Sequence, residues 1–149
     1  MGELMIKHNE LTAEEFILLW ETVWGQGPAL EQTRLAMEHT LFRVSVFDGN
    51  QIVAMARVIG DMGLDYYIKD VIVRPEYQGK GIGRALTEAC IECARAAGYL
   101  QLELEVVAGN RRAEELYKSV GFVEYGRNPK GFRSRNSGWQ ENVLMRLEL

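Results

Sequence analysis

Short segments in which apolar and polar residues alternate recur along the chain, and a period of two is typical of strands. The segments predicted as strands are residues 4–8, 42–47, 52–59, 64–73, 100–106, 122–125 and 143–149. Elsewhere apolar residues return every three or four positions, which predicts helices after Thr12 and over residues 29–39, 81–97 and 111–119. Strands dominate the first half of the chain and helices separate the later strands, so we expect an α/β fold.

Local signals support several of these boundaries. Thr12 and Glu15 have the spacing of a capping box at a helix start. The tight-turn sequence Asp48-Gly49-Asn50 lies between two strand segments and predicts an antiparallel hairpin. Pro75 ends the strand before it because proline lacks the N–H group that a sheet needs, and Gly98 is a natural helix stop.

The size and charge of the chain narrow its class. Its 149 residues are 47% hydrophobic, which suits one domain over residues 1–149. Its net charge of −4 argues against general attraction to nucleic acid or to a membrane surface. Residues 1–70 contain eleven acids and five bases, whereas residues 71–149 contain ten acids and twelve bases. The second part of the chain therefore suits an anionic ligand better than the first.

Cys90 and Cys93 form a Cys-x-x-Cys pair, a spacing that also occurs in redox and metal sites. The pair falls within a predicted helix without a second cysteine pair, so we expect two small core residues and no metal. The first residues carry acids where a signal peptide is basic, and no apolar run has the length of a membrane span. We therefore expect a cytoplasmic protein without a membrane partner.

Residues 126–140 form the one long stretch predicted as irregular. They contain Arg127, Lys130, Arg133 and Arg135 and no acid. Long loops are often functional, and a merely solvated basic loop fits the same composition.

A glycine-rich segment, Gln78-Gly79-Lys80-Gly81-Ile82-Gly83-Arg84, joins a predicted strand directly to a predicted helix. Glycines permit positive φ and lack the β-carbon that would keep a ligand from the backbone. Backbone N–H groups and the positive end of a helix dipole bind phosphate groups well, and Lys80 and Arg84 add positive charge. The segment therefore predicts an anion site.

Two common nucleotide motifs do not fit this segment. A Walker loop needs Gly-x-x-x-x-Gly-Lys-Ser/Thr, and the Rossmann fingerprint needs Gly-x-Gly-x-x-Gly/Ala. Here Arg84 follows Gly79-x-Gly81 and Leu86 follows Gly81-x-Gly83, so neither register is satisfied.

Two blocks of the sequence resemble the GNAT superfamily of N-acetyltransferases. Val71-x-Val73-x-Pro75-x-x-Gln78-x-x-Gly81-x-Gly83 is similar to its acetyl-coenzyme A signature, Gln/Arg-x-x-Gly-x-Gly/Ala. Asn110-x-x-Ala113-x-x-x-Tyr117-x-x-x-Gly121-Phe122 follows a predicted strand at the distance that this superfamily uses. The motifs occupy about residues 70–122, and the order of elements agrees over nearly the whole chain.

The resemblance implies a fold and a co-substrate, acetyl-coenzyme A (acetyl-CoA). The implied sheet is mixed, mostly antiparallel and flanked by helices, with two parallel strands, residues 67–73 and 102–106, that splay apart to form the coenzyme cleft. The backbone of Val71, Ile72 and Val73 would bind the pantetheine arm, and Asn110 would contact its end. The residues implied for the pyrophosphate are Gln78, Gly79, Lys80, Gly81, Ile82, Gly83 and Arg84.

The implied reaction is direct attack of an amine on the thioester through a tetrahedral intermediate. A protonated amine must first lose a proton, and a backbone N–H near Val71 is suited to stabilise the oxyanion. Tyr117 stands where the superfamily has the acid that protonates the departing thiolate. Its alternative role is packing on the turn at Gly121-Phe122.

The general base has several candidates. Glu105 lies twelve residues before Tyr117, the spacing of the catalytic glutamate in ribosomal-protein N-terminal acetyltransferases of the superfamily, but Glu103 and Glu105 also suit a solvated strand face. Histone-type members carry their glutamate on the preceding strand, where an ungapped count reaches Tyr67. Asp70 is the second candidate, and an ion pair with Lys69 or with an arginine of residues 126–140 is its alternative role. Many relatives use only ordered waters.

Only the distribution of charge along the chain bears on the identity of the acceptor amine. The acidic residues 1–70 suit a cationic amine such as a polyamine or aminoglycoside. The basic residues 126–140 suit a phosphorylated amine, an acidic peptide, the 3′-phosphate of the coenzyme or a dimer interface. We favour a small-molecule amine over a protein N-terminus or lysine.

Two further expectations rest on the superfamily. A coenzyme-binding module without turnover is the alternative function, because a ligand pocket does not guarantee its chemistry, although Tyr117 favours an enzyme. Dimerisation is common in the superfamily, and an exposed edge at residues 143–149 would serve a homodimer.

Overall fold

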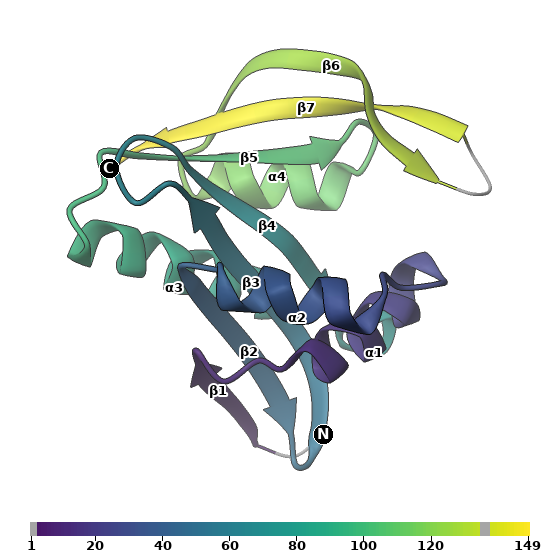
Figure 1. Cartoon of the computed structure of the whole chain (residues 1–149). Coiled ribbons are helices and arrows are strands. Elements are labelled where there is room, and N and C mark those ends of the chain that lie inside the picture. Colours follow the sequence, from purple (N-terminus) through teal and green to yellow (C-terminus); the bar gives the residue numbers. More distant parts are fainter. Residues whose placement is uncertain (1–2, 135–137) are drawn as a thin grey trace.

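The computed structural model describes residues 3–134 and 138–149, which form one seven-stranded sheet with helices on both faces (Figure 1). The strands are β1 Leu4–His8, β2 Phe42–Asp48, β3 Gln51–Gly60, β4 Tyr66–Val73, β5 Gln101–Val107, β6 Val123–Ser134 and β7 Gly138–Glu148. The helices are α1 Ala13–Trp24, α2 Leu30–Glu38, α3 Ile82–Ala96 and α4 Arg111–Ser119, with a short 3-10 turn at Pro75–Tyr77. The order in the sheet is β1-β2-β3-β4-β5-β7-β6. The expected α/β class and mostly antiparallel sheet are confirmed.

The sheet is almost divided in two between β4 and β5. Strands β1 to β4 form one antiparallel group, and β5, β7 and β6 form another. In the described chain, β4 and β5 run parallel and pair only at Tyr67 and Glu103. The two strands part beyond this pair, which confirms the splayed parallel pair expected from the resemblance.

A bulge in β4 changes which residues face each side of the sheet. The register with β3 shifts between Met55 and Arg57, and opposite that shift Asp70 adopts a left-handed conformation with φ of 54°. Before the bulge, Ile68 packs into the core on the side of α3, and after it Val71 packs against the same core. The bulge therefore turns Val71 toward the α3 side, and Ile72 toward the side of α1.

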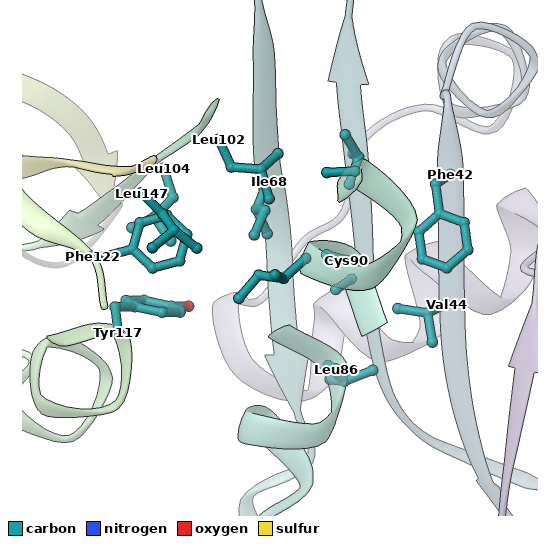
Figure 2. Packing of buried hydrophobic residues seen from close by; sticks show 14 of the residues in the cluster. Phe42, Val44, Ile68, Leu86, Cys90, Leu102, Leu104, Tyr117, Phe122 and Leu147 are labelled. Carbon is teal, nitrogen blue, oxygen red and sulfur yellow. The ribbon is translucent and has the colours of Figure 1, made fainter. Parts of the chain in front are cut away.

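Each face of the sheet has its own core. On the face that carries α3 and α4, here called the α3 face, Leu86 and Cys90 of α3 pack with Leu102 and Leu104 of β5 (Figure 2). On the opposite face, here called the α1 face, Phe16 and Leu19 of α1 pack with sheet residues that include Met55 and Ile72. Both cores share the central strands.

Local sequence signals explain several element boundaries. At the start of α1, the Glu15 N–H donates to Thr12 Oγ1 at 3.1 Å and the Thr12 N–H donates to Glu15 Oε1 at 2.9 Å, so the predicted capping box is confirmed. Gly98 follows the end of α3 with φ of 82°, which favours glycine. The prediction that Cys90 is a core residue is confirmed, because its side chain is fully buried.

Two predictions about the last part of the chain are wrong. Residues 126–140 were expected to be irregular, but most of them belong to the β6–β7 hairpin, in which Arg127 pairs with Val143 and Arg133 with Trp139. Arg135 lies outside the described residues. The predicted edge at residues 143–149 is also absent, because β7 lies between β5 and β6. The strands at the two edges are β1 and β6, so β7 offers no free edge to a second copy of the chain.

No helix in the described part of the chain is both long and apolar enough to span a membrane.

Candidate active site

A groove of about 740 Å³ lies where β4 parts from β5, between the starts of α3 and α4. It brings together most residues predicted to bind the coenzyme. Those that line it are Val71, Val73, Gln78, Gly79, Gly81, Ile82, Gly83, Arg84, Asn110 and Tyr117. Two predicted residues are not among those that line it. Ile72 is buried on the α1 face, and Lys80 lies beside the groove, with its Nζ 5.8 Å from the centroid of the Tyr77 ring that lines it. Ile72 is also paired with Met55 of β3, so neither its side chain nor its backbone groups face the groove.

The three glycines of residues 78–84 have different structural roles. Gly79 and Gly81 have φ of 78° and 84°, in the left-handed region where a side chain is strained. Gly81 is the N-cap of α3, whose first N–H groups lack partners within the helix. Gly83 is helical, and a β-carbon there would lie 3.2 Å from Leu116 Cδ2. Gly83 thus lets α3 and α4 approach each other, while Gly79 and Gly81 shape a turn of the kind that suits an anion.

Arg111 and Arg112 also line the groove, and sequence reasoning missed them. They occupy the first turn of α4, after the Asn110 cap, where the helix dipole disfavours a positive charge. The Arg112 guanidinium lies 3.8 Å from where a β-carbon of Gly79 would stand. Two adjacent bases at a helix start were the available signal, because their placement is favourable when an anion lies between them and the glycine turn.

Two predicted residues hold the groove's own structure. Asn110 Oδ1 accepts a hydrogen bond from the Ala113 N–H at 3.3 Å and so caps α4. Arg84 reaches from α3 to the end of α4, where it donates to Ser119 Oγ at 2.5 Å, and it lies 3.7 Å from Glu88. The start of α3 is therefore held against the end of α4 beside the glycine turn.

The edge of β4 at Val73 faces the gap between the strands. The Arg74 N–H donates to Val53 O of β3 at 2.8 Å, and backbone groups of successive strand residues point to opposite edges. The backbone of Val73 therefore points away from β3, and its carbonyl accepts a hydrogen bond from Gln78 Nε2 at 3.0 Å. Gln78 thus ties the glycine segment to the open strand edge.

Tyr117 lies at the inner end of the groove and is only 7% exposed. Its ring packs edge-on against Phe122, with 6.0 Å between centroids (Figure 2). Burial raises the pKa of the Tyr117 hydroxyl to about 12. The hydroxyl stays protonated at neutral pH, as a proton donor must, and the ring also has the packing role that the sequence left open.

Asp70 pairs with Arg57, at 2.7 Å between Oδ2 and Nε, and not with Lys69 or with a described arginine of residues 126–140. Arg57 also donates to Thr40 Oγ1 at 3.0 Å and lies over the Phe16 ring. Both charged side chains are mostly buried, at 17% and 16% exposure. The ion pair holds the bulge of β4 against β3, which favours a structural role for Asp70 over that of a base.

The two glutamates of β5 lie on the α1 face, because Leu102, Leu104 and Val106 point into the opposite core. Glu103 lies beside Tyr67, and the hydrogen bond between them raises the pKa of Tyr67 to about 12. Glu105 accepts a hydrogen bond from Asn142 Nδ2 at 2.9 Å. Glu105 is thus exposed but oriented, which a freely solvated glutamate is not.

Other features of the described residues lie apart from this groove. A smaller hollow of about 410 Å³ lies along β6 and β7 and is lined by Gly121, Val123, Tyr125, Arg146, Leu147 and Glu148. The described residues contain no group of three His, Cys, Asp or Glu side chains that could hold a metal ion.

Curated proteins similar to this chain include two named acetyltransferases. A thialysine N-epsilon-acetyltransferase of Bos taurus is 42% identical over 59 residues, which are 40% of this chain and 35% of the relative. The ribosomal protein bS18 alanine N-acetyltransferase of Escherichia coli is 35% identical over 80 residues, which are 54% of this chain and 53% of that protein. The chain thus spans between a third and about half of the length of these relatives.

Solved structures share the fold over almost the whole chain. An acetyltransferase of the GNAT family from Streptococcus pneumoniae has a TM-score of 0.82 at 22% identity, covering 99% of this chain and 100% of its own. A putative acetyltransferase from Salmonella typhimurium, solved with acetyl-CoA, has a TM-score of 0.77 at 19% identity, covering 99% of this chain and 95% of its own. The sequence model of the Acetyltransferase (GNAT) family matches residues 9–122. The chain therefore belongs to the GNAT family of acetyltransferases.

Proposed function

We propose that this chain transfers an acetyl group from acetyl-CoA to a primary amine, and that a small-molecule amine is the preferred acceptor. The observation that carries the proposal is the groove between the parted strands, which joins a glycine turn at a helix start to the buried hydroxyl of Tyr117. The names of the curated relatives support an amine acceptor, since they specify a lysine analogue and a protein alanine. The two cores share one sheet, which supports a single catalytic domain over residues 1–149.

The residues of the groove fit acetyl-CoA. A β-carbon at Gly81 would meet no atom within 4 Å, so the glycine leaves open space over the start of α3. The backbone of Gly79 and Gly81, with Arg111 and Arg112, would hold the phosphates, and Lys80 and Arg84 stand close by. The open edge of residues 71–73 would bind the amide-rich pantetheine arm as a strand binds a strand. Bound acetyl-CoA supplies an activated thioester.

The side chains on the α1 face and Tyr117 would then move the protons. An acceptor that arrives as an ammonium ion gives one proton to Glu105, and its nitrogen lone pair then attacks the thioester carbon. The new C–N bond gives a tetrahedral intermediate with a negative oxygen, from which the C–S bond breaks. Tyr117 gives its proton to the departing sulfur, and a backbone N–H near Val71 stabilises the negative oxygen. The second proton of the nitrogen restores the Tyr117 hydroxyl, and Glu105 releases the first proton to solvent, so the net products are the amide, the thiol and one proton. Asp70 remains the second candidate for the base.

The charge near the parted strands favours a cationic acceptor. Glu103 and Glu105 both lie on the α1 face, and residues 1–70, which supply most of that face, carry six more acids than bases. Arg127 of β6 does not reverse this balance, because it is opposite Val143, whose side chain lies on the α3 face, and it is paired with Glu124 and Glu141 at 2.8 Å each. We therefore place polyamines, aminoglycosides and lysine-like amines ahead of phosphorylated amines.

Calorimetry followed by thiol release tests the proposal. Acetyl-CoA is titrated into the purified protein, and free thiol is then measured with spermidine, kanamycin, thialysine, lysine and a peptide with N-terminal alanine. Binding followed by thiol release with an amine is the expected result. Binding without release for every amine would favour a coenzyme-binding module. Absence of binding would contradict the proposal at its first step.

A further inference from the structure

Asn142 of β7 carries a buried polar atom that has no hydrogen-bond partner among the described residues. The residue is 6% exposed, and its Nδ2 donates to Glu105 Oε2 at 2.9 Å. Its Oδ1 is buried, and within residues 3–134 and 138–149 no donor reaches it. A buried acceptor without a donor is costly and rare in folded proteins, and it therefore points to a group that arrives from outside.

The orientation of this amide follows from its partner. A carboxylate such as Glu105 only accepts hydrogen bonds, so the NH₂ group of Asn142 must face it and the carbonyl oxygen must face away. Turning the amide over would place two acceptors against each other at Glu105 and leave two donors without partners. The buried position of Oδ1 is therefore not interchangeable with that of Nδ2.

A bulge in β6 clamps Asn142 in place. Residues 129–131 of β6 stand opposite the single residue Glu141 of β7, between the pairs Asn128–Asn142 and Phe132–Gln140. A β-carbon on Gly131 would lie 2.5 Å from Asn142 Cβ and 2.6 Å from both its Cγ and its Nδ2. Real atoms do not approach so closely, so only glycine lets the β6 backbone lie on this side chain. The amide is thus held between Gly131 and Glu105.

The pair lies on the face where an acceptor would meet the parted strands. Glu105 is opposite Leu144, two residues from Asn142 on the same side of β7, and Val143 and Met145 point into the other core. The α1 face is bounded here by α1 and β6, whose Trp24 and Phe132 rings approach to 6.0 Å between centroids. Phe132 is opposite Gln140, two residues from Asn142 on the same side of β7, so this ring contact lies next to Asn142 along the strand.

We propose that Asn142 is a specificity-determining residue whose Oδ1 accepts a hydrogen bond from the acceptor's ammonium group, while Glu105 accepts a second. This inference rests on the proposed function and adds an amine-binding residue to it. A primary ammonium has three N–H groups, so it fills both acceptors and keeps one for solvent. A quaternary ammonium of similar charge fills neither. The site therefore selects by hydrogen bonds as well as by charge, and Gly131 is its positioning residue.

Direct binding of simple ammonium ions tests this assignment without knowledge of the natural acceptor. The wild-type protein, saturated with free coenzyme A so that no transfer occurs, is titrated with n-butylammonium and separately with tetramethylammonium. The side-chain amide resonances of Asn142 are followed by ¹⁵N NMR. We expect n-butylammonium to shift them and tetramethylammonium to leave them in place. No shift with n-butylammonium, or equal shifts with both ions, would overturn the inference.

A matched pair of glycine variants tests the clamp. Gly131→Ala should displace the amide and weaken n-butylammonium binding by about 10- to 100-fold, the loss expected for hydrogen bonds to a charged group. Gly126→Ala on the same strand is the control, because its β-carbon would make an ordinary contact with Leu144 Cδ1 at 3.6 Å. Equal binding by the two variants would refute the role of Gly131.

Two further measurements separate this inference from the proposed function and from misfolding. In an Asn142→Gly background, Gly131→Ala should cause no additional loss of ammonium binding, since the atoms it would strike are gone. Acetyl-CoA affinity, measured by calorimetry, should stay at the wild-type value in every variant. If the wild type does not bind acetyl-CoA, the proposed function is contradicted. If Asn142→Gly binds acetyl-CoA normally and binds n-butylammonium as tightly as the wild type does, this inference alone is contradicted.

Discussion

Tyr117 shows how one residue serves both the core and the groove. Its ring belongs to the core on the α3 face, where it meets Phe122, and its position beside the glycine turn makes it part of the groove wall. The surroundings that bury the ring also keep the hydroxyl protonated, because an ionised phenol would lack solvation there. Packing and proton donation are therefore compatible roles.

Replacing Tyr117 with Phe keeps the ring and removes the proton donor. We expect kcat to fall by about 10²- to 10⁴-fold, the usual contribution of a general acid, with acetyl-CoA affinity unchanged. Steady-state kinetics and calorimetry measure the two quantities. Tyr99→Phe is the control, since Tyr99 stacks on Tyr66 away from the groove and should keep full activity. Full activity in Tyr117→Phe would contradict the assigned acid.

The raised pKa of Tyr117 also predicts how stability changes in alkali. The unfolded tyrosine loses its proton near pH 10, whereas the folded one keeps it until about pH 12. Between these values the unfolded state binds fewer protons, so the free energy of unfolding falls as pH rises. From about pH 9 to about pH 11 we expect the wild type to lose about 1 kcal/mol more than Tyr117→Phe, measured by urea unfolding. Parallel losses in both proteins would show that the Tyr117 hydroxyl is hydrated.

The ion pair between Arg57 and Asp70 predicts a loss of stability without a loss of coenzyme binding. Asp70→Asn tolerates the left-handed backbone but leaves Arg57 without a counter-charge in a mostly buried setting. We expect the free energy of unfolding to fall by about 3 kcal/mol. Glu31→Gln, which breaks the exposed pair with Arg34, should cost less than about 1 kcal/mol. A stable Asp70→Asn variant with much lower kcat would return Asp70 to the role of base.

At the scale of elements, the two ends of α3 are similar in backbone and different in function. Gly81 begins the helix with φ of 84° and Gly98 follows it with φ of 82°, and a β-carbon at either position meets no atom within 4 Å. Any substitution is therefore strained to the same degree at both. What distinguishes them is their surroundings, since Gly81 alone lines the groove.

This likeness gives a matched pair of variants. Gly81→Glu and Gly98→Glu should each lose about 1–2 kcal/mol of stability from the left-handed backbone. We expect acetyl-CoA affinity to fall by about 100-fold or more in Gly81→Glu only, because its carboxylate would face phosphate groups. Calorimetry measures the affinity and urea unfolding the stability. Equal affinities in the two variants would place the phosphates away from the start of α3.

The element that sequence reasoning misjudged is β6. The helices and the first five strands could be predicted because their period, caps and turns are local, as at Thr12, Gly98 and Asp48-Gly49-Asn50. In residues 126–134, glycines and Pro129 interrupt the alternation and imitate a loop. The segment is a strand because it lies at the sheet edge, where a proline is tolerated and a bulge absorbs the extra residues.

At the scale of the whole molecule, the candidate site depends on contacts that the sequence does not display. The glycine turn and Tyr117 belong to continuous motifs, so their part of the groove could be predicted. The pairs Asp70–Arg57 and Glu105–Asn142 join residues 13 and 37 positions apart. The second pair exists only because β7 enters the sheet between β5 and β6, out of sequence order.

The divided sheet predicts a change in hydrogen exchange when acetyl-CoA binds. Arg74 N–H is bonded to β3, whereas the backbone of Val73 points into the gap. We expect the amide proton of Val73 to exchange quickly in the free protein and to slow by about tenfold or more with acetyl-CoA, while that of Arg74 changes little. Exchange followed by ¹⁵N NMR reports both. An unchanged exchange rate at Val73 would show that the pantetheine arm of acetyl-CoA does not lie along this edge of β4.

The bulge at residues 129–131 also bears on how such an enzyme can diverge. Between the strand pairs Asn128–Asn142 and Phe132–Gln140, three residues of β6 stand opposite one residue of β7, so regular pairing is already interrupted there. We therefore expect exchanges there to alter what lies over Asn142, while the groove between α3 and α4 on the other face keeps its lining. Changes in the bulge would thus let related proteins differ in the amine that they acetylate while they use the same acetyl donor.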